Sequence, residues 1–91
     1  MSHHILKIKL KYAIPKIDGI KSFEIRQNDR DFQIGDTICY QCIDDILMDE
    51  MMSKRLYKIT YITDYHQTDG YVVFTDKLLS IDGENINEKR N

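Results

Sequence analysis

Charged and amide side chains are concentrated in residues 19–36, a segment that begins at one glycine and ends beside another. If its first part is a half-buried strand, side chains alternate between two faces, so Phe23 and Ile25 face a core. Glu24 and Arg26 then share the opposite face, where a carboxylate and a guanidinium project together. The polar side chains of the segment are Lys21, Glu24, Arg26, Asn28, Asp29 and Arg30. Their convergence predicts a cleft for a polar ligand.

The cations in and near this segment are suited to binding phosphate. Arg26 and Arg30 offer planar forks that bind phosphate through two hydrogen bonds and stack on base faces. Lys7 and Lys21 act as point charges, and Lys21 opens the expected strand, where the chain can aim it toward the cleft. Reading the edge of a base needs further donors, acceptors and a stacking ring. The candidates for that role are Asn28, Asp29, Gln67 and Tyr71.

A purely structural role for the same charges is an open alternative. Glu24 and Arg26 occupy same-face positions on one expected strand, so they can simply pair with each other. Ion-pair networks of this kind often resemble binding sites. Residues 28–31 can equally be a turn, in which Asn and Asp side chains bond their own backbone.

The length and composition fit one small folded domain. The chain has 91 residues, of which 42% are hydrophobic, enough for one core but not for two domains. We expect residues 1–81 to form the domain and residues 82–91 to be a polar tail. The net charge is −2, but residues 1–33 carry seven Lys or Arg against four Asp or Glu, and residues 34–91 carry six against eleven. The polar segment therefore lies in the basic part of the chain.

Cysteine and histidine usage gives no support to a metal or redox site. Cys39 and Cys42 form one C-x-x-C inside an apolar run, and the histidines do not stand at zinc-finger spacing. The run favours a strand rather than the helix start that a thioredoxin-like pair needs. We therefore expect reduced, buried thiols, no metal and no cofactor.

The sequence also predicts a protein of the cytoplasm that does not enter membranes. No window reaches the roughly 18–20 apolar residues of a membrane-spanning helix. The start of the sequence, residues 1–4, lacks the apolar core of a signal peptide.

Periodicity outlines the elements that must position the polar segment. Residues 4–11 alternate between apolar side chains and lysines, which predicts a half-buried first strand. Further strands are expected at residues 21–26, 37–43, 56–63 and 71–75, the last able to continue to 80. A short helix is expected over 12–18, and 44–53 fits either a loop or a short helix. Five to six strands with one or two short helices favour an α+β fold, a small mixed β-barrel, because closure removes exposed edges.

The pattern G-x-K-x-x-E-x-R at residues 19–26 resembles the signature of ASCH domains, which belong to the PUA-like barrel superfamily. Similarity to a small bacterial and phage branch of that family continues at residues 4–7, 28–36 and 69–72. Together these patches run from residue 4 to about residue 79. The resemblance implies a β-barrel with a cleft at one end, lined by the signature residues, and binding of RNA or a nucleotide there.

Two further functions stay open. Some relatives in the wider superfamily are amidohydrolases of acylated cytidine, and by position their lysine matches Lys21, whereas their threonine falls at Glu24 and their glutamate has no clear counterpart. Lys21 and Glu24 would then be catalytic, with Glu24 a general base if burial raised its pKa. In the other alternative the domain is non-catalytic, and residues 44–52, which are acidic and apolar, dock a protein partner.

Overall fold

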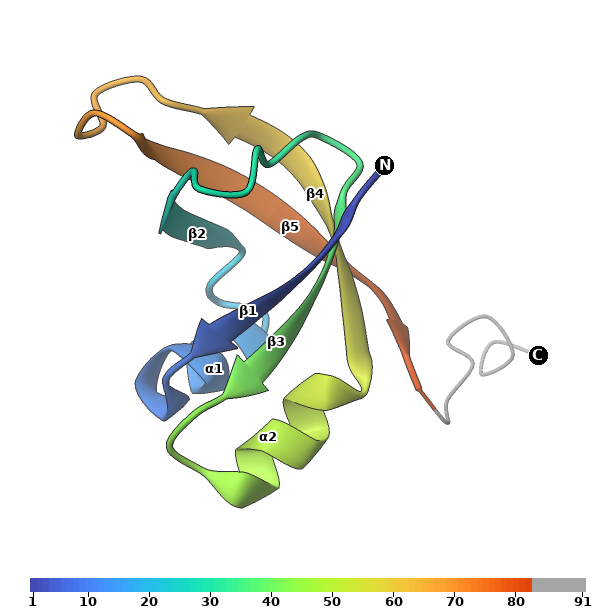
Figure 1. The fold of residues 1–91 in the computed structure, drawn as a ribbon. Coiled ribbons are helices and arrows are strands. Elements are labelled where there is room, and N and C mark those ends of the chain that lie inside the picture. Colours follow the sequence, from blue (N-terminus) through green and yellow to red (C-terminus); the bar gives the residue numbers. More distant parts are fainter. Residues whose placement is uncertain (83–91) are drawn as a thin grey trace.

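A computed structural model describes residues 1–82, which form one curled five-stranded sheet with both helices at one end of it (Figure 1). The elements are β1 (His3–Ile8), α1 (Leu10–Ile17), β2 (Phe23–Gln27), β3 (Thr37–Cys42), α2 (Ile46–Ser53), β4 (Arg55–Thr63) and β5 (Tyr71–Ile81). The expected small mixed α+β fold of five strands and two short helices is therefore confirmed. The expected tail falls almost wholly outside the described residues.

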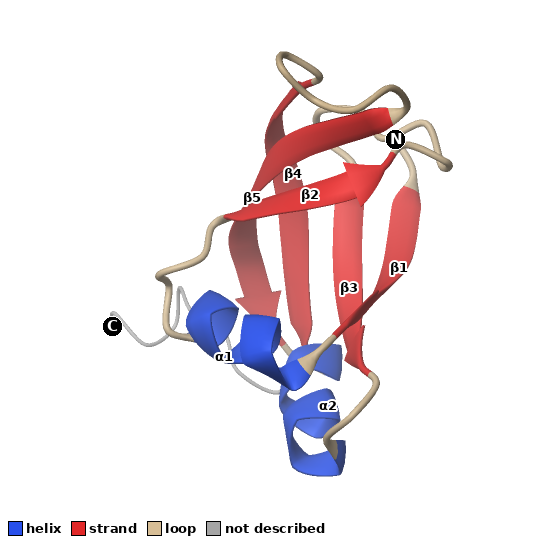
Figure 2. Ribbon diagram, turned by 90° about the vertical axis from the view of Figure 1, so that its left-hand side faces the viewer, coloured by secondary structure: helices blue, strands red, loops and turns tan. Residues whose placement is uncertain are grey.

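The strand order is β1-β3-β4-β5-β2, with β1 parallel to β3 and the other pairs antiparallel. The two edge strands, β1 and β2, thus pair with strands that come later in the chain. The sheet twists strongly, and in Figure 2 β2 crosses in front of the other strands. It forms a half-barrel that stays open between β1 and β2, so full closure does not occur.

Arginine side chains bridge the opening between β1 and β2. Ser2 and Ile8 accept backbone hydrogen bonds from β3 and its flanks, so the carbonyls of the alternate residues point away from β3. Arg26 Nη2 donates to the Lys7 carbonyl at 2.9 Å, and Arg30 Nη1 donates to the Ile5 carbonyl at 2.7 Å. These bonds satisfy two acceptors of an otherwise unpaired sheet edge.

The first strand is shorter than the alternation of lysines predicts. It ends at Ile8, and α1 begins at Leu10. Asp44 Oδ1 accepts a hydrogen bond of 2.7 Å from the Leu10 amide, one of the donors that a helix N-terminus leaves unpaired. A remote carboxylate therefore helps to fix the helix start, which no local pattern could reveal.

Residues 44–53, expected as a loop or a helix, contain α2. The Asp45 side chain accepts a hydrogen bond of 2.8 Å from the Met48 amide and so caps the helix. Met52 is buried, whereas Ile46 and Leu47 are exposed. No helix within residues 1–82 is long and apolar enough to cross a membrane.

The core lies on the concave side of the sheet and beneath the helices. Its buried apolar residues are Leu6, Ile8, Ala13, Phe32, Ile38, Tyr40, Cys42, Met52, Tyr57, Ile59, Val72 and Phe74. The alternation that predicts the first strand is visible here, because Leu6 and Ile8 are both buried. Burying one such side chain stabilises the fold by roughly 1.5–3 kcal/mol.

A buried carboxylate ties the start of the chain to the turn before β3. Asp36, only 1% exposed, accepts hydrogen bonds from the Ser2 amide at 3.0 Å, the His4 ring at 2.8 Å and the Gln33 amide at 3.0 Å. Burial opposes ionisation of Asp36, but these three donors outweigh it and hold its pKa below the usual value. His4 is therefore a structural residue in this fold.

Candidate functional site

The face that β2 turns to the interior is the opposite of the one expected. Phe23 and Ile25 are 44% and 57% exposed, whereas Glu24 is 4% exposed. The expectation was wrong because it assigned the apolar side chains to the core, while this stretch of interior is occupied by a charged network. A carboxylate with several cationic partners can be buried, and the neighbouring apolar residues then face outward.

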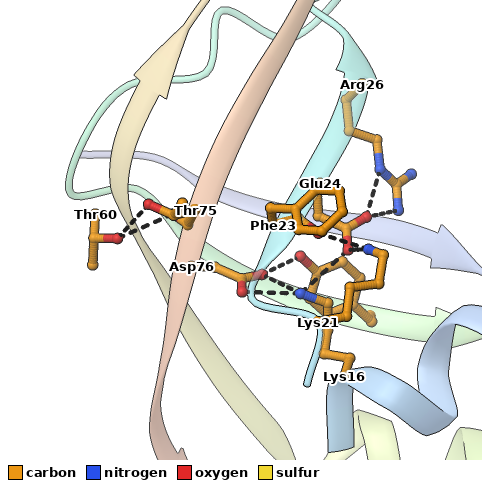
Figure 3. A network of polar contacts seen from close by, with 9 residues as sticks. Lys16, Lys21, Phe23, Glu24, Arg26, Thr60, Thr75 and Asp76 are labelled. Atoms are coloured by element: carbon orange, nitrogen blue, oxygen red, sulfur yellow. Dashed lines mark hydrogen bonds and ion pairs between the residues drawn. The ribbon is translucent and has the colours of Figure 1, made fainter. Parts of the chain in front are cut away.

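Glu24 is the centre of that network, which Figure 3 shows from close by. Its Oε1 accepts hydrogen bonds from Arg26 Nε at 3.1 Å and Arg26 Nη2 at 2.9 Å. Its Oε2 accepts a hydrogen bond from Lys21 and lies 3.2 Å from Lys16 Nζ. Three cations therefore surround one carboxylate. The pairing of Glu24 with Arg26, which the structural alternative expected, is present, and Lys21 contacts the other carboxylate oxygen.

A second buried acid, Asp76 of β5, extends the network. Lys16 Nζ donates to both Asp76 oxygens at 2.9 Å, and the Tyr40 hydroxyl donates to Asp76 Oδ2. The Lys16 side chain is 1% exposed, and its Nζ lies 5.0 Å and 5.4 Å from the ring centres of Tyr40 and Tyr57. Lys16 thus bridges Asp76 and Glu24, and joins α1 to the two strands β5 and β2.

The predictions from the sequence do not include Lys16 or Asp76, although each is a charged residue at a position whose neighbours on the same face are buried. Asp76 has the same parity on its strand as Val72 and Phe74, which are buried, so an acid stands at an interior position. Lys16 follows the buried Ala13 by three residues, so the two lie on one face of α1. Two opposite charges on otherwise buried faces predict a buried ion pair.

The charge environment keeps Glu24 ionised. Burial raises its pKa, but the Lys16 charge, the Lys21 hydrogen bond and the Arg26 charge together bring it below the usual value of 4.5. Burial and the charges of Glu24 and Asp76 raise the pKa of Tyr40, so its hydroxyl stays a donor. The amidohydrolase alternative needed a Glu24 pKa raised by burial, and the direction here is the opposite. A carboxylate of low pKa is a poor general base at neutral pH.

Acid should weaken the fold through Glu24. A carboxylate whose pKa is lower in the folded than in the unfolded chain stabilises the fold above its unfolded pKa, and this contribution is lost as the pH falls through the folded pKa. We expect urea titrations to show Glu24→Gln less stable than the wild type, by a difference that is constant above about pH 5 and shrinks below about pH 4. A difference independent of pH down to pH 3 would show that folding does not lower the pKa of Glu24.

A cleft of about 490 Å³ opens beside this network, between β1, α1 and β2. It is lined by Lys7, Ile8, Lys9, Tyr12, Lys21, Phe23, Glu24, Ile25, Arg26 and Ile43. The outward side chains of Phe23 and Ile25 contribute an apolar wall, and lysines and Arg26 supply positive charge. Lys21 Nζ lies 5.2 Å from the Phe23 ring centre and 5.9 Å from that of Tyr12, within cation–π distance of both.

The predicted site residues divide between this cleft and other places. Lys7, Lys21, Glu24 and Arg26 line the cleft. Asn28, Gln67 and Tyr71 line a separate cavity of about 190 Å³ beside the turn at Gly70. Asp29 and Arg30 line neither of these two cavities. The predicted site residues therefore do not line a single cleft.

Local hydrogen bonds account for part of this division. Asn28 Oδ1 accepts a hydrogen bond of 2.9 Å from the Phe32 amide, so its side chain holds the loop as the turn interpretation expected. Arg30 is committed to the Ile5 carbonyl and lies 3.8 Å from Asp29. These side chains have the right chemistry for a ligand, but their types and spacing could not show that backbone groups already use it.

The cysteines are both free thiols. Cys42 is buried and Cys39 half-buried, and burial raises the pKa of each thiol above its usual value. A raised pKa disfavours the thiolate that reacts with oxidants or binds metals. Both cysteines of this C-x-x-C are therefore reduced, as expected. The expected burial is confirmed in full for Cys42 only.

Comparison with known proteins supports a family assignment. The comparison with curated proteins gave no match. A family model described as "Domain of unknown function (DUF3850)" matches residues 3–75, from the first residue of β1 into β5. The matched range contains both helices and the Lys16, Glu24 and Arg26 positions, and it ends one residue before Asp76. Because the match covers most of the sequence, this chain belongs to the DUF3850 family.

Proposed function

We propose that the protein binds RNA or a single nucleotide in the cleft between β1, α1 and β2. The observation that carries the proposal is the combination of two exposed aromatic rings, Phe23 and Tyr12, with the cationic group of Lys21 at 5.2 Å and 5.9 Å from their ring centres. A nucleobase needs an apolar face on which to stack, and its phosphate needs fixed cations. A volume of about 490 Å³ also falls within the roughly 300–1,000 Å³ common for small-molecule sites.

Within this proposal the residues divide the work by their position. Phe23 and Tyr12 offer faces for a base, while Lys7, Lys9 and Lys21 attract phosphate. Glu24 fixes the cations rather than reading a base, because both of its oxygens already accept hydrogen bonds or ion pairs. Fixing cations before the ligand arrives reduces the entropy lost on binding.

We also propose that the half-barrel is of the ASCH type within the PUA-like superfamily. What supports this is that the signature positions Lys21, Glu24 and Arg26 meet at one cleft, where Lys21 and Arg26 both contact Glu24. An open, strongly curled sheet of five strands is compatible with such a barrel.

The proposal is tested by titrating the protein with a short fluorescent single-stranded RNA and following anisotropy at low salt. Replacing Phe23 by alanine should weaken binding about 5- to 150-fold, since a stacked base contributes roughly 1–3 kcal/mol. Tyr61→Ala is the matched control, because Tyr61 is an exposed ring on β4 that does not line the cleft. Lys9→Gln, which removes a cleft cation without touching the Glu24 network, should also weaken binding and reduce its salt dependence.

Two outcomes would reject this function. One is the absence of binding to RNA, DNA and free nucleotides at low salt. The other is binding that Tyr61→Ala weakens as much as Phe23→Ala does, which would place the ligand outside the cleft.

A further inference from the structure

A further cavity, of about 220 Å³, lies where the end of α1 and the following loop meet β4 and β5. Its polar lining residues are Lys16, Lys21, Ser22, Arg55, Tyr57 and Asp76. Lys21 also lines the nucleotide cleft, so the two cavities are neighbours that share one side chain. The volume is below the roughly 300–1,000 Å³ typical of organic ligands and therefore suits a small ion.

The lining carries an excess of positive charge. It contains three cations, of Lys16, Lys21 and Arg55, and one carboxylate, of Asp76. That carboxylate is already satisfied, since Lys16 contacts both of its oxygens and the Tyr40 hydroxyl donates to one of them. Lys21 has three N–H donors, and two of them are used by Glu24 and the Phe23 carbonyl. A donor of Lys21 and the Nε of Arg55 are left for another acceptor.

Arg55 carries the most specific indication of a missing partner. Its Nε is buried and has no hydrogen-bond partner within residues 1–82. A buried donor without a partner costs roughly 1–3 kcal/mol, and a guanidinium cannot escape that cost by losing its proton. Whatever satisfies Arg55 Nε must accept hydrogen bonds, and the surrounding charge favours an anion.

Neutral donors stand beside these cations. Ser22 and Tyr57 each bring a hydroxyl group to the lining. Burial raises the pKa of Tyr57, and the nearby Arg55 charge opposes only part of that rise. The Tyr57 hydroxyl therefore keeps its proton at neutral pH and can donate. Cations combined with hydroxyl donors and no uncompensated carboxylate match the acceptor oxygens of a phosphate group.

We propose that this cavity is a second ligand site, which binds a phosphate-type oxyanion through Arg55, Lys21 and the hydroxyls of Tyr57 and Ser22. The ion is either free inorganic phosphate or a phosphate group of a nucleotide whose base occupies the neighbouring cleft. The site itself stands on its own lining and does not require the proposed function of the cleft.

Isothermal titration of the 91-residue chain with inorganic phosphate, at constant ionic strength set by chloride, tests the site. Arg55→Gln should weaken phosphate binding at least about tenfold, because it removes charged hydrogen bonds of roughly 1.5–3 kcal/mol. Lys58→Gln is the control, since Lys58 is an exposed cation on the same strand that does not line the cavity. Arg55→Lys keeps the charge and loses the fork, so its affinity should fall between those of wild type and Arg55→Gln.

The sources of the ion are separated by two further ligands, uridine and uridine 5′-monophosphate. If Arg55→Gln weakens the monophosphate but not uridine, the site holds the phosphate of a bound nucleotide. If it weakens inorganic phosphate alone, the site holds the free ion, and both results support the proposal. Loss of uridine binding in Phe23→Ala with phosphate binding unchanged would separate the cleft from this site.

The proposal is overturned if phosphate gives no heat and no amide shifts at Ser22 and Tyr57 in an NMR titration. It is equally overturned if chloride produces the same shifts, or if Lys58→Gln weakens phosphate as much as Arg55→Gln. Urea unfolding of Arg55→Gln identifies a folding defect. Should that variant be unfolded, Tyr57→Phe, which removes only a hydroxyl, provides the same comparison, and equal phosphate affinity in Tyr57→Phe and wild type then counts against the site.

Discussion

Replacing Lys16 by methionine should lower the free energy of unfolding by about 3–5 kcal/mol, the cost of leaving buried charges without their partner. Methionine fills a similar volume and keeps the apolar stem, so the lost contribution is the ammonium group. Its removal leaves Asp76 with only the Tyr40 hydroxyl as a side-chain partner among residues 1–82, and leaves Glu24 with Arg26 and Lys21. Urea unfolding followed by circular dichroism at neutral pH measures the change.

Lys77→Met is the matched control for this loss. Lys77 follows Asp76 directly on β5 but is exposed, so the same substitution should change stability by no more than about 0.5 kcal/mol. Adding Asp76→Asn to Lys16→Met should recover part of the stability, because the amide carries no charge and still accepts from Tyr40. If Lys16→Met is as stable as Lys77→Met, the buried network does not stabilise this fold.

Removing the Asp36 carboxylate should cost about 3 kcal/mol, because the buried His4 ring and two backbone amides in partly buried bonds then lose their acceptor. In Asp36→Ala the Ser2 amide, the His4 ring and the Gln33 amide are all left unpaired. The first two belong to the start of the chain and the third to the turn before β3. The variant should therefore also expose the amides of β1 to hydrogen exchange before those of β4.

The control for this prediction is Asp29→Ala. Asp29 is exposed, and its closest charged partner within residues 1–82, Arg30, lies 3.8 Å away, so its removal should be nearly neutral. Equal stability of the two variants, or uniform exchange in β1 and β4 of Asp36→Ala, would contradict a localised role for Asp36.

The fold was predictable where local pattern and tertiary environment agree. The alternation around Leu6 and Ile8 predicts β1 correctly because one face of that strand packs on the apolar core and the other faces solvent. The same rule fails at Glu24, since β2 turns its polar side chains to the interior and its apolar ones to a cleft. Phe23 and Ile25 line the cleft, which is neither core nor open solvent. A rule that assigns every residue either to the core or to solvent cannot predict such a position.

The candidate site was predictable in its centre and not in its surroundings. Lys21, Glu24 and Arg26 lie within six residues of one another, so a strand assignment suffices to gather them. Lys16 and Asp76 are 60 residues apart and meet only because β2 pairs with β5. Tyr12 and Arg55 carry no pattern that marks them as lining residues. Such contacts depend on topology, which spacing along one chain does not encode.

The pairing of β2 with β5 has a consequence for synthesis on the ribosome. Residues 23–27 are synthesised well before residues 71–81, so β2 cannot pair with β5 until most of the sequence has been translated. Because chains emerge at about 5–20 residues per second, the nascent β2 strand spends seconds without its sheet partner. During that interval Phe23 and Ile25 lie on a strand without its partner, and both side chains stay exposed even in the finished fold, so a chaperone that binds apolar stretches of growing chains should recognise this segment.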